Sequence, residues 1–85
     1  MARPGPASGL PEHLRSAGVT RREHDVLSLI GQGATNAEIA ERLVLSRRTV
    51  EHHVANLLRK LDCANRSQLV SRALQSAEDG ARGET

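Results

Sequence analysis

The stretch from Ser46 to Leu61, SRRTVEHHVANLLRKL, constrains the fold most, because apolar residues recur in it at helical spacing. They follow one another at i, i+4, i+7, i+8 and i+11, which places them on one face of a helix that turns about 100° per residue. These residues are Val50, Val54, Leu57, Leu58 and Leu61. Such a face must pack on other parts of the chain.

The opposite face of this predicted helix is polar and basic. In helical projection, the positions opposite the apolar stripe are Arg48, His52, Ala55 and Arg59. Beside them lie Glu51 and Asn56, and along one shoulder of the helix lie Thr49, His53 and Lys60. Ser46 is a favourable N-cap, and free backbone N–H groups at a helix start can bind a phosphate. These properties suit insertion into a DNA major groove, although a solvated amphipathic helix explains this stretch alone equally well.

The composition and the distribution of charge limit the kinds of nucleic acid that the chain is expected to bind. With 85 residues the chain forms one small domain with a limited core. It has no Phe, Tyr or Trp, which argues against RNA or single-strand modules that stack unpaired bases on aromatic rings. Residues 42–72 hold seven Arg or Lys against two acids, a net charge of +5, whereas the whole chain carries +2. The second half therefore presents the basic surface.

No metal, cofactor or membrane is expected. Cys63 is the single cysteine, so it forms no internal disulfide, and it is expected to be a small core residue. The adjacent His52 and His53 point about 100° apart and do not form a metal-binding pair. The sequence contains no signal-peptide core and no run long enough to span a bilayer, so we expect a soluble, cytoplasmic, nucleoid-associated protein.

Start signals upstream predict two further helices. Thr20 with Glu23 and Thr35 with Glu38 each form a T-x-x-E capping box. The first opens a helix over residues 21–31, which a left-handed Gly33 ends, and the second opens a short helix that ends before residue 44. The link to the helix over residues 46–61 is then about three residues long, which is a helix-turn-helix by spacing.

Asn65, with Gln68 three residues later, predicts the start of a fourth helix that continues to about Ser76. The predicted fold is thus an all-α, four-helix helix-turn-helix domain over residues 19–77. Residues 1–18 are expected to form a flexible arm or linker with room for a short helix around Leu14, and residues 78–85 a polar tail.

Four ordered motifs then carry a resemblance to a known family. They are T-x-R-E-x-x-V-L from Thr20, G-x-[ST]-N-x-E-I-A from Gly33, L-S-x-x-T-V-x-x-H from Leu45, and K-L followed by N-R from Lys60. Over residues 19–74 the sequence resembles the LuxR-type DNA-binding domain, also called the FixJ or GerE type. The resemblance implies a bacterial transcription regulator whose third helix is the recognition helix in the major groove and whose fourth mediates dimerisation on a two-fold site.

The predicted DNA interface combines this resemblance with side-chain position. Residues expected at phosphates are Ser46, Arg47, Thr49, His53, Arg59, Lys60 and Arg66. Residues expected at base edges are Arg48, Glu51, His52 and Ala55. The resemblance implies the phosphate roles of Thr49, His53 and Lys60 and the base-facing roles of Glu51, His52 and Ala55. Solvated surface charge is the alternative for Arg48.

Glu51 departs from the family pattern, in which this position is often Lys. Two interpretations remain open. Its carboxylate either accepts a hydrogen bond from cytosine N4 or pairs with Arg47, Arg48 or Arg59 and tunes their reach. Either role prevents an operator sequence from being carried over from the family.

The fourth predicted helix has more apolar surface than so small a core can bury. Its residues Leu69, Val70, Ala73 and Leu74 are therefore the expected homodimer interface, although a covering sensor domain explains them equally well. The expected partners are double-stranded DNA, a second copy of the chain, and a sensor or receiver domain that the chain does not contain.

The chain is not expected to be an enzyme. Ser46 lacks an oriented His and Asp set, there is no glycine-rich phosphate loop, and the acids fall at caps or on the surface. The alternative to DNA binding is a helical protein-interaction module that docks a receiver domain or recruits polymerase. Such a module does not need a basic outward face on residues 46–61.

Overall fold

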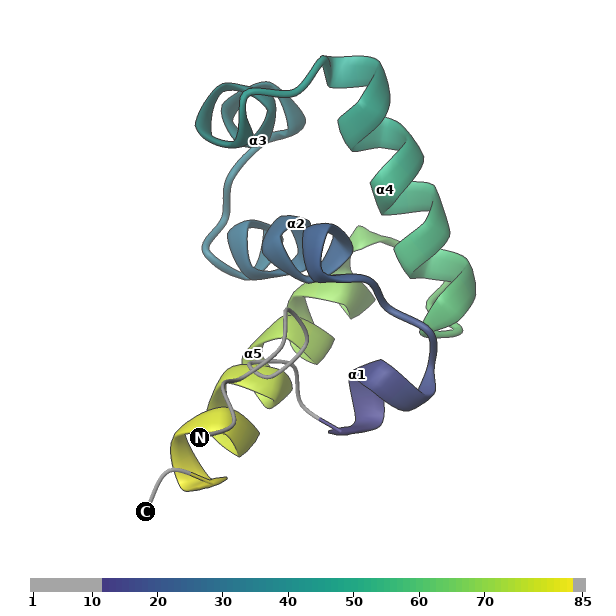
Figure 1. The fold of residues 1–85 in the computed structure, drawn as a ribbon, viewed down its shortest axis with the longest axis vertical. Helices are drawn as coiled ribbons and strands as arrows, with labels where there is room; N and C mark the ends of the chain where they lie inside the picture. Colours follow the sequence, from purple (N-terminus) through teal and green to yellow (C-terminus); the bar gives the residue numbers. More distant parts are fainter. Residues whose placement is uncertain (1–11, 84–85) are drawn as a thin grey trace, which may run out of the picture.

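The computed structural model describes the backbone of residues 12–83 and the side chains of residues 12–76. This part of the chain is helical and contains no strand. In order, its helices are α1 (Glu12–Ser16), α2 (Arg21–Gly31), α3 (Asn36–Leu43), α4 (Arg47–Lys60) and α5 (Arg66–Gly83) (Figure 1). The all-α class is confirmed, and the four predicted helices correspond to α2 to α5.

The helix starts lie where the capping residues predict them. Thr20 Oγ1 accepts from the Glu23 N–H at 3.1 Å, while Glu23 Oε1 accepts from the Thr20 N–H at 3.0 Å. Thr35 and Glu38 form the same reciprocal pair at 3.1 and 2.8 Å. Each box satisfies two backbone donors that the first helical turn leaves open, and this fixes where α2 and α3 begin.

Two left-handed residues set the helix-turn-helix geometry. Gly33, with φ of +90°, reverses the chain after α2, as predicted. Val44, with φ of +56°, follows the end of α3, and residues 44–46 alone link α3 to α4. A β-branched residue is rare in this conformation, so Val44 holds the turn at a cost in backbone strain.

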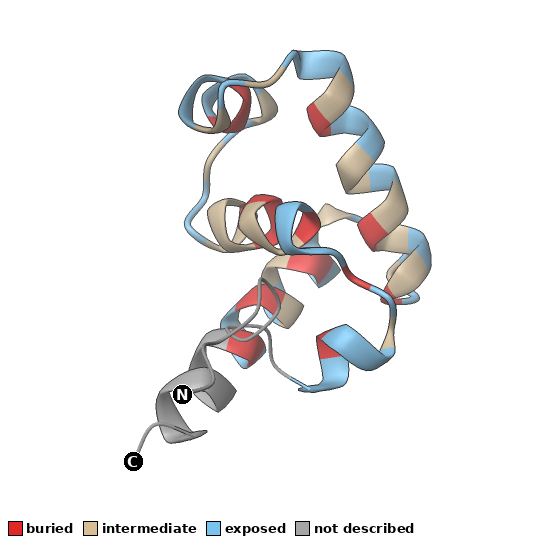
Figure 2. Ribbon diagram, in the orientation of Figure 1, coloured by how far each residue is buried: buried red, intermediate tan, exposed pale blue. Residues whose placement is uncertain are grey.

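The core lies around α2, which packs against α3, α4 and α5 (Figure 1). Its inward residues face the inward stripe of α4, of which Val50, Leu57 and Leu61 are buried and Val54 and Leu58 half-buried. Figure 2 shows the buried positions of the helices turned toward this centre and exposed positions recurring along the outer side of α4. The predicted orientation of α4 is thus confirmed.

The short α1 lies beside α5 and covers one end of the core. Leu14 is fully buried, and its carbonyl accepts from the Val19 N–H at 3.0 Å. His13 Nε2 lies 3.3 Å from Ser76 Oγ on α5. Residues 12–18 of the predicted arm are therefore part of the folded domain, and residues 1–11 lie outside the described part.

The last helix is longer than predicted. Its start is confirmed, because Asn65 Oδ1 accepts from the Gln68 N–H at 3.1 Å. Its end lies at Gly83 rather than at about Ser76, so most of the predicted tail is helical. Apolar periodicity stops at Leu74, and the following residues mix good helix formers such as Ala, Glu and Arg with the poor helix formers Asp and Gly, so the local sequence does not mark where the helix ends.

The described helices include none that is both long and apolar enough to cross a membrane.

Candidate nucleic-acid interface

The N-terminus of α4 is capped by Ser46 and faces outward. Ser46 Oγ accepts from the Thr49 N–H at 3.0 Å and lies 2.9 Å from Thr49 Oγ1. The N–H groups of Arg47 and Arg48 have no acceptor among the described residues. Open N–H groups and the positive end of the helix dipole attract an anion, so this end suits a phosphate.

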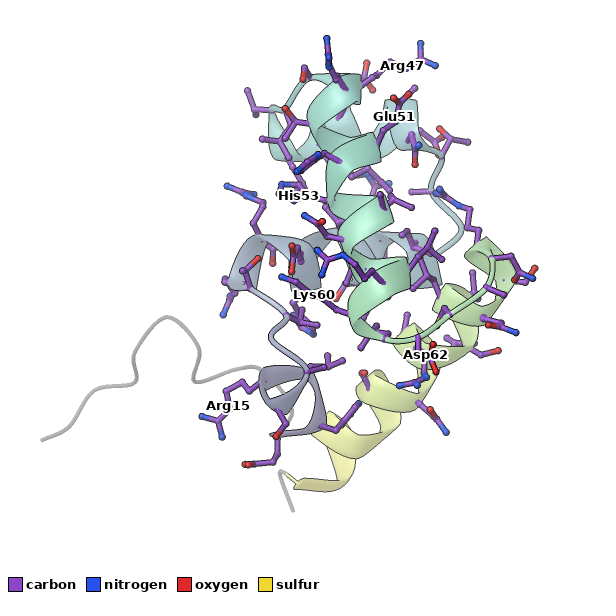
Figure 3. All side chains as sticks on the ribbon, turned by 90° about the vertical axis from the view of Figure 1, so that its right-hand side faces the viewer. Arg15, Arg47, Glu51, His53, Lys60 and Asp62 are labelled. Carbon is purple, nitrogen blue, oxygen red and sulfur yellow. The ribbon has the colours of Figure 1, made fainter. Side chains whose placement is uncertain are left out.

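The outward face of α4 is exposed over its whole length. Its members are Arg48, Glu51, His52, Ala55 and Arg59, all of which are exposed. Arg47, at the first helical position, is exposed beside them. Figure 3 shows this helix in front of the rest of the domain, with Glu51 on one side and His53 and Lys60 on the other. The structure therefore brings together all four predicted base-edge residues.

His53 lies on the shoulder of α4 and is half-buried. Its Nδ1 is buried without a hydrogen-bond partner among the described residues. The ring can therefore offer only its other nitrogen, Nε2, to a phosphate. An unpaired buried ring nitrogen costs about 1 to 3 kcal/mol.

Lys60 has a structural role that the sequence did not indicate, and its phosphate contact stays a prediction. Its Nζ donates to Glu23 Oε1 at 2.8 Å and to the Gly18 carbonyl at 2.9 Å. The side chains of Lys60 and Glu23 are 20% and 4% exposed. Burial alone raises the pKa of the Glu23 carboxyl, but the bonds from Lys60 and from the Thr20 N–H outweigh burial and hold that pKa below its ordinary value of 4.5.

Arg66 is also engaged within the fold, and its phosphate contact stays a prediction. Its Nη1 donates to Asn36 Oδ1 at 2.8 Å, and its Nη2 donates to the Ala34 carbonyl at 2.8 Å. This half-buried guanidinium ties the start of α5 to the start of α3. It therefore positions the helix-turn-helix from inside the domain.

The two interpretations of Glu51 differ in whether it has a cationic partner. Arg59 Nη2 donates to Asn56 Oδ1 at 2.9 Å, and neither Arg47 nor Arg48 makes an ion pair with any described residue. Glu51 itself has no hydrogen-bond or ion-pair partner among the described side chains. In this structure the carboxylate is thus free, and the pairing interpretation finds no support.

The predicted dimer surface on α5 requires correction. Leu69 is fully buried and Ala73 is 8% exposed, so both belong to the core of the single chain. Gly31 explains the burial of Ala73, because a Cβ added at Gly31 would lie 2.7 Å from Ala73 Cβ, which indicates close packing of α2 on α5. Val70 is half-buried against the core, whereas Leu74 is 55% exposed.

The sequence did not predict the surface feature beside Leu74. A shallow hollow of about 510 Å³ lies where α4 ends and α5 begins, and its lining includes Leu74, Arg72 and Cys63. Arg72 Nη2 donates to the Leu61 carbonyl at 3.0 Å, which satisfies an acceptor at the end of α4. Cys63 is half-buried against the core, as predicted.

Comparison with known proteins identifies the family to which this sequence belongs. Residues 17–73, more than half of the chain, match the GerE family model, described as bacterial regulatory proteins of the luxR family. The chain belongs to the luxR family. All four motifs of the sequence lie within the residues that match the luxR-family model.

Three relatives of this luxR-family chain are regulators. It is 50% identical over 58 residues to the uncharacterized transcriptional regulatory protein YhcZ of Bacillus subtilis and 47% identical over 57 residues to the uncharacterized response regulatory protein YgeK of Escherichia coli. It is 41% identical over 66 residues to the HTH-type transcriptional regulator MalT of Vibrio cholerae.

The matches cover 68%, 67% and 78% of this chain but 27%, 39% and 7% of those relatives, respectively. The chain thus corresponds to one part of each longer regulator. The luxR-family domain and its regulator relatives support a role in DNA-binding regulation.

Proposed function

We propose that this chain binds double-stranded DNA in a sequence-specific manner, with α4 in the major groove, as part of a bacterial transcription regulator. The observation that carries the proposal is the outward face of α4, which is exposed from the capped N-terminus to Arg59. A major groove is wide enough to admit one α-helix, and it presents the base edges that distinguish all four base pairs.

The proposed contacts divide into two sets. Those to phosphates come from the start and the flank of α4 and from the last residue of its outward face, namely Ser46, Arg47, Thr49, His53 and Arg59. Those to base edges come from its outward face, namely Arg48, Glu51, His52 and Ala55. Ala55 is small enough to admit a thymine methyl group or a close approach of the helix to the groove. Lys60 and Arg66 support this surface from within the fold, and any phosphate contact they make uses the donors that their intramolecular bonds leave free.

We further propose that the chain binds as a homodimer on a two-fold site. A single small module buries only about 600 to 1,000 Å² on DNA and binds weakly, whereas two half-sites one turn apart combine two such contacts. Exposed Leu74 and the adjoining hollow on α5 support this surface as the place where the second copy docks.

A control domain outside this chain is the other proposed partner. The relatives are longer regulators of which this chain covers a part, and one of them is a response regulatory protein. We propose that a sensor or receiver domain governs DNA binding by the full regulator. DNA as the partner implies that the regulator acts at the nucleoid in the cytoplasm.

The proposal is tested by selecting duplexes from a randomised pool on the purified chain and titrating the enriched duplex and a scrambled one. We expect an enriched inverted repeat that binds more tightly than the scramble. If Arg47 and Arg59 each neutralise one phosphate, the slope of log affinity against log salt is about −1.8 for one protomer and about −3.6 for a dimer. Failure to bind either duplex at low salt would refute the proposal and favour the protein-interaction alternative.

A further inference from the structure

Glu51 is the exposed acid on the otherwise basic or neutral outward face of α4. It has no hydrogen-bond or ion-pair partner among the side chains of residues 12–76. Figure 3 shows it on the side of α4 opposite to His53, away from the ion pair between Lys60 and Glu23. Its negative charge therefore lies near the neighbouring arginines without forming an ion pair with any of them.

The fold does not account for an acid at this position. The N-terminus of α4 is already capped by Ser46, and Glu51 follows the first turn, where a negative charge best stabilises the helix dipole. Arg47 and Arg48, four and three positions earlier, are at the spacing of a helix ion pair, but neither makes an ion pair with a described residue, and Ala55, four positions later, has no charge. Because the side chain is exposed, it also contributes no core packing. The carboxylate is thus available to a ligand.

The effect of this carboxylate on DNA binding depends on whether it faces phosphates or base edges. Phosphates repel it, so Glu51 lowers affinity wherever it faces the backbone. Inside the major groove, however, the base edges differ in what they offer to an acceptor. Cytosine presents its N4 amino donor, whereas guanine presents the acceptors N7 and O6, and thymine presents the acceptor O4 beside a methyl group. Adenine presents the N6 donor next to the N7 acceptor, which repels the second carboxylate oxygen.

We propose that Glu51 selects cytosine at one position of each half-site, by accepting a hydrogen bond from the N4 amino group and rejecting the other three bases. This inference rests on the proposed insertion of α4 into the major groove. The bond is charge-assisted and forms away from bulk water, so it is stronger than a neutral hydrogen bond. Replacing that cytosine is expected to weaken binding about tenfold, which corresponds to about 1.4 kcal/mol.

The charge of Glu51 also makes the choice more stringent than a neutral acceptor does. A glutamine at position 51 keeps the length and shape of the side chain but adds a donor. An amide reads adenine by donating to N7 while accepting from N6. The change Glu51→Gln is therefore expected to shift the preference at that position from cytosine toward adenine, while the other positions of the site keep theirs.

The test repeats the duplex selection with the full chain and with its Glu51→Gln and Glu51→Ala variants. Glu41→Gln is the matched control, because Glu41 is an exposed acid on α3 and its substitution changes the net charge equally. We expect cytosine at one position per half-site for the wild type and for the control. We expect adenine there for Glu51→Gln and no preference there for Glu51→Ala.

Direct titration then distinguishes base selection by Glu51 from a general effect of its charge on the affinity for DNA. For the wild type, exchanging the selected cytosine for thymine is expected to weaken binding about tenfold, and for Glu51→Ala the same exchange is expected to have no effect. If both Glu51 variants instead bind every duplex more tightly, with base preferences unchanged, Glu51 acts only as a charge and the inference is overturned. If the wild type binds no duplex, the proposed function fails together with the inference.

Discussion

Replacing Lys60 by methionine removes the ammonium group that the structure places between Glu23 and the Gly18 carbonyl. The Nζ atom lies 2.8 Å from Glu23 Oε1 and 2.9 Å from Gly18 O. Methionine keeps most of the aliphatic length of the side chain, so packing is largely retained. The variant therefore isolates the loss of the ion pair, which leaves a carboxylate that is only 4% exposed without its cation.

The expected loss of stability follows from the burial of the Lys60 and Glu23 side chains. Removing one partner of a buried ion pair costs about 3 to 5 kcal/mol. The Lys60 side chain is 20% exposed, and Glu23 keeps its bond from the Thr20 N–H, so we expect a loss of about 2 to 3 kcal/mol. A domain of 85 residues is stable by about 4 to 13 kcal/mol in total. The change therefore removes a large fraction of the free energy of unfolding.

Urea denaturation followed by circular dichroism measures this loss. With a slope of about 1 kcal/mol per M urea, the midpoint is expected to fall by about 2 M or more. The control is the double-mutant cycle with Glu23→Gln, which keeps the shape of the cap but removes the charge. In that background Lys60→Met is expected to cost at least 0.5 kcal/mol less, the lower end of the coupling between residues in contact.

The opposite pattern would refute the structural role of Lys60. If Lys60 is a solvated phosphate contact, Lys60→Met leaves the free energy of unfolding within about 0.5 kcal/mol of the wild type. It then weakens binding to every duplex and reduces the magnitude of the salt slope by about 0.9. The two readouts are independent, so the same variant separates the two roles.

Three further predictions concern the rest of the fold. Gly31→Ala is expected to destabilise the domain by about 1 to 3 kcal/mol through overpacking against Ala73, and Ala73→Gly is expected to recover part of that loss in urea denaturation. Val44→Gly is expected to raise the free energy of unfolding by up to about 1 kcal/mol, because relief of left-handed strain exceeds the added chain entropy; a lower urea midpoint would contradict this. Burial, outweighing Asp25, lowers the pKa of His24 below 6.5, and the pKa of Glu23 lies below 4.5, so the unfolded chain binds both protons first. Stability measured against pH is therefore expected to fall as pH drops below about 6.5 and again below about 4.5, and a flat profile would contradict it.

Local signals in the sequence were sufficient to predict α2, α3, α4 and the start of α5. Capping residues act over three positions, and the stripe on α4 repeats within one helix, so both are visible without knowledge of the fold. The exposed position of Arg48 followed from the same periodicity. What these signals could not supply was the full length of α5, because the helix continues past its last apolar residue through residues of mixed helix propensity.

Tertiary partners account for what the sequence did not reveal about the predicted interface residues. Lys60 and Arg66 resemble surface cations in the sequence, but their acceptors Glu23 and Asn36 lie 37 and 30 residues away along the chain. Likewise, the burial of Ala73 depends on the absence of a side chain at Gly31, on another helix. A pattern within one helix carries no information about such contacts, so neither the intramolecular bonds of Lys60 and Arg66 nor the burial of Ala73 could be predicted.

The central claim, that the outward face of α4 binds duplex DNA, is tested most directly by charge reversal at Arg48. Fluorescence anisotropy titrations of the selected duplex compare Arg48→Glu with Arg15→Glu, which changes the net charge equally but lies on α1. We predict that Arg48→Glu weakens binding at least a hundredfold while Arg15→Glu stays within about threefold of the wild type, with both variants folded by circular dichroism. Equal losses for the two variants, or no loss for Arg48→Glu, would contradict the claim.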